Sequence, residues 1–488
     1  MPKFYKYQLA VLISLFQMLF VHAQRQQTQL SSEEGDVITS NESLASDGES
    51  YTVFTIRNIF ITGNKKTKEN IILRELPFKI GQKYRIQQLV DRFELGRRLL
   101  MNTTLFHEAI ISMKGFEGDK IDIAVEVSER WYVFPLPYLV PVDRNMNQWL
   151  FEQNADLSRT NYGLKVIHNN VTGRNDKLRL WFVTGYTKHV SFNYERPYID
   201  KSMKWGLKIT SSIGKRREIN YSTLNNKQQF LKDDNSYLYY FSKTGVEVSY
   251  RNAIKVQHRL GINYITEKVS DTVVTLNPSY FPTGRKSLGY PEFYYTFQYY
   301  NLDYNAYPTK GYAAEASLYK KGVSQKINVW QLSTKAMGNW HLNPKTFFNT
   351  TVFACVKLPF RQPYSNQQLL GYNGIFMQGY EYYVIDGVAG AYLKASVTRK
   401  LFNFNINMPA NRFVENKKIP FTIFARVFGN AGYVHHPEPG ENLLANRFLT
   451  SAGAAIDILT FYDFTLKLEW TFNQLGQNGL FLHPKTKF

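Results

Sequence analysis

The sequence predicts an all-β membrane barrel of about 16 antiparallel strands, preceded by one small α+β domain. Aromatic residues make up 16% of the 488 residues, yet the mean hydropathy is only −0.35. After the first 25 residues, no stretch approaches the roughly 18 continuous apolar residues that a membrane helix requires. Short segments in the later part of the chain instead alternate apolar and polar residues, as strands between lipid and water do. A large soluble all-β protein has a similar composition. The alternation of apolar and polar residues and an export signal therefore favour the membrane barrel over the soluble protein.

The N-terminus has the pattern of a secretory signal. Residues 1–23 contain two lysines, then an apolar core from Leu9 to Val21, and end in small residues at a suitable cleavage position. The core is too short to span a bilayer comfortably. Residues 24–50 are rich in Gln, Ser, Glu and Asp and poor in apolar residues, which predicts a disordered linker.

Residues 51–130 have the pattern of a small α+β domain with the element order β-α-α-β-β. Gly63-Asn64 is a turn signal between the first strand and the first helix, and Gly81 ends that helix. Apolar residues recur at helical or alternating spacings in each element. The predicted elements are a strand at Thr52–Thr62, helices at Glu69–Leu76 and Ile86–Leu100, and strands at Phe106–Met113 and Ile121–Val127.

Residues 131–488 are predicted to form the barrel. The clearest strand alternates apolar residues with Thr, Lys, Glu and Asn; its apolar face comprises Phe464, Leu466, Leu468, Trp470 and Phe472. Successive side chains in a strand point to opposite faces, so one face is apolar and the other is polar. A sandwich strand of a soluble protein would alternate in the same way. Weak alternation and turn residues predict long loops at Lys215–Asn235, Ser270–Gly289 and Gln362–Gly387.

The composition argues against several classes of function. The net charge of +20 is suited to contact with anionic lipid headgroups and lipopolysaccharide, and export makes a nucleic acid an unsuitable partner. One cysteine, Cys355, permits neither an internal disulfide nor a zinc motif. His435 and His436 are adjacent, so on a strand they would point to opposite faces rather than share a metal. We therefore expect no enzyme activity, cofactor or metal. These two histidines and Ser451 are the residues that come nearest to a catalytic set.

The predicted α+β domain resembles a POTRA (polypeptide-transport-associated) domain, and the chain resembles the BamA/TamA-type superfamily of outer-membrane assembly factors, also called bacterial surface antigens. The matching stretches are Ile56–Asn64, Leu99–Phe106 and Ile121–Val127. Glu129–Tyr132 is similar to the junction into the barrel in single-chain relatives of Bacteroidetes type. The order of these elements is the specific part of the resemblance.

Three barrel motifs extend the resemblance. Tyr194–Asp200 is similar to an early strand-to-turn signature of the family. A hairpin motif comprises Asp303, Pro308 and Gly311, where Pro308 fixes φ and Gly311 permits a positive φ. The family's lumen-loop motif, normally a small apolar residue followed by Arg-Gly-Phe/Tyr, is represented here by Met377 and then by Gln378, Gly379 and Tyr380.

One departure from the family motif concerns charge. The family's loop arginine pairs with an aspartate in a Phe-x-Asp-x-Gly strand segment, but this chain has Gln378 and, in the segment Phe428–Gly432, Asn430. Losing the arginine alone would leave a poorly solvated carboxylate. The hypothesis is that Gln378 and Asn430 form a neutral amide–amide pair. The alternative is a solvated loop residue and an unrelated turn residue.

The resemblance implies protein insertion or translocation at the bacterial outer membrane, with the POTRA domain in the periplasm. Unfolded or secreted client proteins, and other assembly components, would be its partners. The client-binding POTRA edge would be the strand with Ile121, Ile123, Val125 and Val127, and the barrel seam would lie at the strand Phe464–Phe472. The alternatives are an accessory or scaffold role, secretion of one dedicated partner, and a passive porin.

Overall fold

The computed structural model describes residues 53–141, 149, 154–324, 326–372, 374–407, 418–460 and 463–484. The predicted signal peptide, residues 1–23, and the predicted linker, residues 24–50, lie outside this described part. Among the described residues, no helix is both long and apolar enough to cross a membrane. The described residues divide into two compact units, one with residues 53–63, 76–99 and 108–128, and the other with residues 64–75, 100–107 and the described residues from 129 to 484.

The N-terminal elements match the predicted β-α-α-β-β order, with one short strand added before the second helix. They are β1 (Val53–Thr62), α2 (Glu69–Glu75), β2 (Lys83–Arg85), α3 (Ile86–Asn102), β3 (Phe106–Glu117) and β4 (Lys120–Glu129). The four strands form one sheet in the order β2-β1-β4-β3, in which β1 and β4 run parallel. The edges of this sheet are therefore β2, with three residues, and β3, with twelve.

The predicted client-binding edge is wrong. Strand β4 lies between β1 and β3, so it is an internal strand. Its four apolar residues are core residues, with Ile121, Ile123 and Val125 at 0% exposure and Val127 at 7%. The alternating pattern reported a buried face correctly, but a pattern of this kind says nothing about which strands lie on either side. The exposed edge available to a partner is β3.

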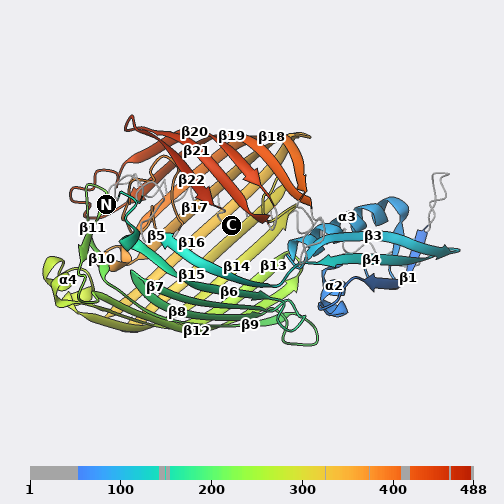
Figure 1. Cartoon of the computed structure of the whole chain (residues 1–488), viewed down its shortest axis with the longest axis horizontal. Coiled ribbons are helices and arrows are strands. Elements are labelled where there is room, and N and C mark those ends of the chain that lie inside the picture. The colour runs from blue at the N-terminus through green and yellow to red at the C-terminus, as the bar shows by residue number, and fades with distance from the viewer. Residues whose placement is uncertain are drawn as a thin grey trace. The chain divides into compact units, whose positions relative to one another are not determined.

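Sixteen of the remaining strands form one antiparallel sheet that curves around a central space (Figure 1), which confirms the predicted fold class and strand number. The hydrogen-bonded order runs from β22 to β5. The strands are β5 (Val133–Pro141), β6 (Thr160–Asn169), β7 (Lys177–Gly185), β8 (Thr187–Arg196), β9 (Trp205–Arg216), β12 (Tyr239–Ala253), β13 (Val256–Val269), β14 (Ser287–Leu302), β15 (Gly311–Ser324), β16 (Ile327–Asn343), β17 (Thr346–Leu358), β18 (Ala389–Asn407), β19 (Lys418–His435), β20 (Phe448–Leu459), β21 (Thr465–Asn473) and β22 (Asn478–Pro484).

The barrel is apolar outside and polar inside, the reverse of a soluble protein. On β21, Leu468, Trp470 and Phe472 are between 42% and 53% exposed, whereas Glu469 and Thr471 are 1% exposed. An outward apolar face opposite a buried polar face is the arrangement that lipid around a barrel requires. The alternation seen in the sequence thus places its apolar side chains toward the membrane.

The predicted seam strand is also wrong. Residues 465–473 form β21, which pairs with β20 on one side and with β22 on the other. Phe464 precedes the strand. Strand β22 was missed because it is short and contains Gly479 and Pro484, which weaken a strand pattern. The two end strands in the sheet order are therefore β5 and β22.

The three predicted long loops all lie between barrel strands. The first contains the hairpin of β10 (Glu218–Leu224) and β11 (Lys227–Lys232), and the second contains helix α4 (Asp271–Leu276). The third, residues 359–388 between β17 and β18, is called the lumen loop below. Its Leu369, Leu370, Met377, Tyr380 and Ile385 share one buried apolar cluster with barrel residues such as Phe353 and Tyr392. The loop is therefore packed against the barrel wall.

Candidate functional site

The hairpin motif between β14 and β15 forms as predicted. Asp303 accepts hydrogen bonds from the backbone N–H of Thr309 at 3.0 Å and from its hydroxyl at 2.6 Å. Gly311 has φ +106°, and a Cβ there would lie 2.0 Å from the carbonyl oxygen of Asn301. Only glycine fits such a position without a shift of the backbone. Pro308 lies in the turn that this aspartate closes.

The lumen-loop motif is held against β20 and β21. Gly379 has φ +88°, and a Cβ there would lie 2.8 Å from the Cβ of Ser451. The amide of Asn473 donates to the Gly379 carbonyl at 2.7 Å, and the Tyr380 hydroxyl donates to the Thr450 carbonyl at 3.0 Å. The glycine is needed for close approach, and the neighbouring contacts fix the loop on the wall.

The two amides of the predicted pair make no direct hydrogen bond to each other. The side-chain oxygens of Gln378 and Asn430 are both buried without a hydrogen-bond partner, so neither amide accepts from the other. The amide of Asn430 donates to the Ser451 hydroxyl at 3.0 Å, and that hydroxyl donates to the backbone carbonyl of Gln378. Ser451 thus links the two positions through the main chain of the loop, while the Gln378 side chain points elsewhere.

The side chain of Gln378 reaches a charged network that the sequence interpretation missed. Its amide donates to Glu469 on β21 at 3.3 Å. Arg426 on β19 donates to the same carboxylate at 2.6 Å and makes a two-pronged contact with Asp457 on β20 at 2.9 and 3.0 Å. Tyr307, from the β14–β15 turn, donates to Asp457 at 2.7 Å. The guanidinium therefore comes from the barrel wall, and the loop supplies a neutral amide.

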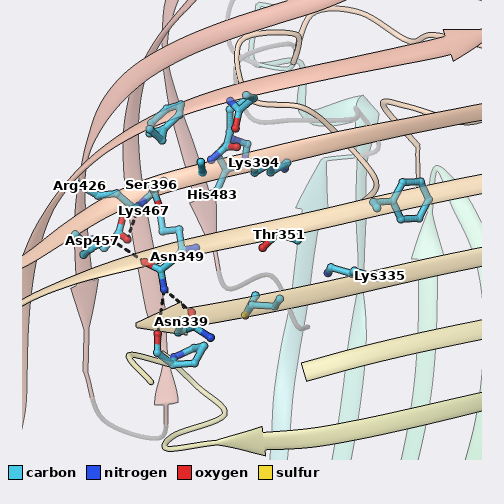
Figure 2. Close-up of a pocket in the computed structure, with 18 of the residues that line it drawn as sticks. Lys335, Asn339, Asn349, Thr351, Lys394, Ser396, Arg426, Asp457, Lys467 and His483 are labelled. Carbon is cyan, nitrogen blue, oxygen red and sulfur yellow. Dashed lines mark hydrogen bonds and ion pairs between the residues drawn. The ribbon is translucent and has the colours of Figure 1, made fainter. Parts of the chain in front are cut away.

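These groups line a cavity of about 630 Å³ inside the barrel. Figure 2 shows Arg426 beside Asp457, with Lys394, Lys467 and His483 near them and Lys335 farther along the wall. Lys394 also lies 4.4 Å from the ring centre of Phe376 in the lumen loop. Charged groups of both signs and aromatic and other apolar side chains line the cavity together, and they come from the lumen loop, the β14–β15 turn and strands β15 to β22.

A second charged contact holds the end of helix α2 to strand β12 and to the turn after β8, within one compact unit. Arg251 donates to both oxygens of Glu75 at 2.6 and 3.0 Å, and the Tyr198 hydroxyl donates to Glu75 at 2.8 Å. Tyr198 belongs to the predicted strand-to-turn motif. Burial opposes ionisation of Glu75, but the charge and hydrogen bonds of Arg251 outweigh it and hold the pKa of Glu75 below its usual value.

The first barrel strand, β5, has an unusual outer edge. The backbone N–H of Asn169 donates to the carbonyl of Tyr132 at 2.8 Å, just before β5. In an antiparallel pair this bond means that the backbone N–H and C=O groups of even-numbered residues in this segment point toward β6. The odd-numbered positions, whose backbone groups point to the outer edge, include Pro135, Pro137 and Pro141. Proline has no N–H to donate, and prolines in sheets are confined to such edges.

The outer edges of the two end strands differ. Within β5, outward N–H groups remain only at Val133 and Leu139, and the indole of Trp131 donates to the Val133 carbonyl. In the β21–β22 hairpin, the backbone N–H of Asn473 donates to the carbonyl of Gln477 at 3.0 Å. The backbone N–H and C=O groups of even-numbered residues of β22 therefore point away from β21, toward the outer edge of the sheet. That edge retains N–H groups at Asn478, Leu480 and Leu482. Strand β5 is thus the weaker pairing edge.

Part of the chain matches a known protein family. Residues 54–130 match the POTRA family, described as "Surface antigen variable number repeat". No curated protein matches the sequence. Solved structures that resemble the chain include BamA from Haemophilus ducreyi lacking POTRA domains 1–3, at 15% identity, with 88% of this chain and 84% of that chain covered and a TM-score of 0.49. CdiB from Escherichia coli is 10% identical, with 95% and 96% covered and a TM-score of 0.47. CdiB from Acinetobacter baumannii is 11% identical, with 87% and 71% covered and a TM-score of 0.43.

Residues 54–130 are thus a POTRA-type domain, and a 16-stranded barrel follows it in the same chain. This order, with the POTRA-type domain first and the barrel second, is the order that the sequence motifs predicted.

Proposed function

We propose that this chain assembles or translocates proteins at the outer membrane, and that it binds client strands by adding them to an exposed sheet edge. The observation that carries the proposal is a barrel whose first strand, β5, has lost three outward N–H donors to Pro135, Pro137 and Pro141. A barrel that serves only as a pore gains nothing from a weak seam, whereas a client strand needs a place where the wall opens.

The POTRA domain supplies the second edge in this proposal. Strand β3 lies at the edge of its sheet and exposes Ile110, Met113 and Phe116 at 46%, 47% and 76%. Exposed apolar side chains along an edge strand suit an extended apolar client, since main-chain hydrogen bonds give affinity and side-chain contacts add selectivity. The domain would face the periplasm, where such clients arrive unfolded. On this proposal no side chain performs covalent chemistry, and the surrounding lipid and lipopolysaccharide are structural partners.

The alternative is an accessory or dedicated-partner secretion barrel without general insertase activity. The same prolines favour it, because an edge with so few N–H groups is a poor template for building new strands. In that case β5 would let the seam part, and any templating would fall to β22, whose outward positions Asn478 and Leu482 have N–H groups.

A photo-crosslinking experiment tests the proposal and separates the two candidates. A photoreactive amino acid at Met113 on β3 should capture client proteins in cells, whereas the same amino acid at Val90 on α3, which is 61% exposed, serves as the matched control. Capture of many unfolded barrel proteins at Met113 supports general assembly, and capture of one exported protein supports dedicated secretion. Equal, unselective capture at both positions would remove client binding at β3 from the proposal.

Depletion of the protein supplies an independent readout. General assembly predicts that many outer-membrane proteins fall together in abundance, and dedicated secretion predicts the loss of one partner. If the abundance of every exported and outer-membrane protein stays unchanged, neither role holds.

A further inference from the structure

Three side chains that can bind metals, from three separate segments, meet at one side of the lumen cavity. Glu381 comes from the lumen loop, Glu469 from β21 and His483 from β22. One carboxylate oxygen of each glutamate and one ring nitrogen of the histidine all lie within 4.8 Å of one another. Both glutamates are buried and the histidine is half-buried. The sequence offered no ligand spacing here, because the three residues are brought together only by the fold.

The distances around the histidine are long for hydrogen bonds and are those expected around a metal ion. His483 Nε2 makes a long hydrogen bond of 3.4 Å with Glu381 Oε1 and lies 3.4 Å from Glu469 Oε2. A charge-assisted N–H···O bond is typically about 2.7–2.9 Å long, and one N–H cannot serve both carboxylates well. Ligand atoms about 2.1 Å from a tetrahedral zinc ion are about 3.4 Å apart. The two histidine–carboxylate separations match that value, and the separation of the two carboxylate oxygens is within 4.8 Å.

The other oxygen of each carboxylate is already held in place. Glu469 Oε1 accepts from Arg426 at 2.6 Å and from Gln378 at 3.3 Å, and Glu381 Oε2 accepts from the Gly379 N–H at 2.7 Å. Glu469 Oε2, on a side chain that is 2% exposed, has no hydrogen-bond partner and faces the histidine. Outer contacts of this kind orient ligands in known metal sites, and an orphaned buried oxygen is costly unless something binds it.

The histidine ring is also fixed. Phe376 of the lumen loop stacks on His483 with ring centres 4.8 Å apart, and Phe481 stacks at 6.4 Å. Lys394 and Lys467 line the same cavity, and their positive charges oppose a divalent cation. We therefore expect weaker binding than at a structural zinc site of cysteines and histidines.

We propose that Glu381, Glu469 and His483 bind one divalent transition-metal ion of the zinc type, with the cavity leaving room for water as a fourth ligand. One imidazole and two carboxylates suit such ions better than calcium or magnesium, which prefer oxygen alone. The ion would tie the lumen loop to the last two barrel strands. The role of the ion rests on the proposed function: the bound ion would hold β22 in place and oppose opening of the seam.

The test measures zinc bound to the full-length protein, purified in detergent without a polyhistidine tag and stripped with a chelator. After equilibration with micromolar free zinc, the wild type should retain one ion per chain, counted by mass spectrometry. E381Q and H483Q should lower zinc affinity by at least about ten-fold. H258Q is the matched control, because His258 contacts Tyr295 on the exposed face of the barrel and should leave binding unchanged.

Two further measurements keep the test decisive. Each variant must keep the heat-modifiable gel mobility of a folded barrel. A variant that fails this folding check gives no information about binding, so a second measurement uses the wild type alone. Cobalt is added to the wild-type protein, where the visible absorption of a four-coordinate cobalt ion is expected. Absence of both zinc retention and cobalt absorption, or equal zinc binding by wild type, E381Q and H483Q, overturns the proposal. These readouts need no client, so they do not depend on the proposed function.

Discussion

The weak edge of β5 leads to a direct test of the seam. Replacing Pro135 and Pro137 by threonine restores two outward N–H groups at positions where the backbone faces away from β6. Each restored hydrogen bond contributes about 1 kcal/mol, so the pair contributes about 2 kcal/mol to the closed seam. Since 1.4 kcal/mol is a factor of ten, the open population should fall about 30-fold.

Spin labels report that population in the purified protein. One label replaces Leu139 on β5 and the other replaces Leu482 on β22; both side chains are exposed, at 70% and 41%. The native Cys355, which is buried in β17, is replaced by alanine so that only these positions react. The double threonine variant should narrow the distance distribution between labels and remove its long-distance part, and client assembly or export in cells should slow in parallel.

The matched control replaces Pro291, which lies in the internal strand β14, by threonine. That substitution adds an N–H far from the end strands and should leave the distance distribution unchanged. If the double variant keeps the wild-type distribution, or if the Pro291 variant changes it as much, the missing donors of β5 do not set the strength of the seam.

Further predictions concern the charged contacts. E75Q should leave Arg251 without its buried carboxylate, at a cost of about 3 kcal/mol, and hydrogen exchange in the segment around Glu75 should rise. The same contact depends on pH: because the folded-state pKa of Glu75 is lowered from 4.5, its stabilisation is complete above that value and is lost as pH falls through the lowered value, which exchange at stepped pH would show. R426M should strand two buried carboxylates and destabilise the barrel by about 3–5 kcal/mol, whereas Q378A should cost only about 1 kcal/mol; thermal unfolding in detergent compares them, and equal losses would contradict the assignment of the charge to the wall.

The sequence was sufficient for the fold class because alternation is a local property. In β21 the order Leu468-Glu469-Trp470-Thr471 places apolar and polar groups on opposite faces whatever the neighbouring strands are, and the exposed fractions agree. Glycine positions were equally local: Gly311 and Gly379 both adopt positive φ, as their turn and loop motifs require.

Neighbour relations were not local and were mispredicted. The apolar residues of β4 alternate as they would in an edge strand, yet β4 pairs with β1 and lies next to β3. The prolines of β5 did carry a usable signal, since three prolines at one parity are tolerated only where that side lacks a partner ladder. The signal becomes readable once the register with β6 is known.

The charged network was out of reach for the same reason. Arg426 faces Ala455 in the register of β19 and β20, and Asp457 lies two residues further along β20. Glu469 in turn faces Ala455 on the other side. Arg426 and Glu469 thus face the same residue of β20 from its two sides, and Asp457 lies diagonally from both. Because the three side chains come from three strands, no spacing within one segment reveals them.

The location of the guanidinium has consequences for movement of the loop. An arginine on the loop would have to abandon a buried carboxylate whenever the loop left the wall, at a cost of several kcal/mol. Here Arg426, Asp457 and Glu469 remain paired within the wall when Gln378 withdraws, and only a neutral donor is lost from Glu469. The charge that stabilises the barrel is thereby separated from the contacts that hold the loop. Release of the loop is then controlled by weaker contacts through Ser451 and Asn473, and by an ion at Glu381 and His483 if that site is filled.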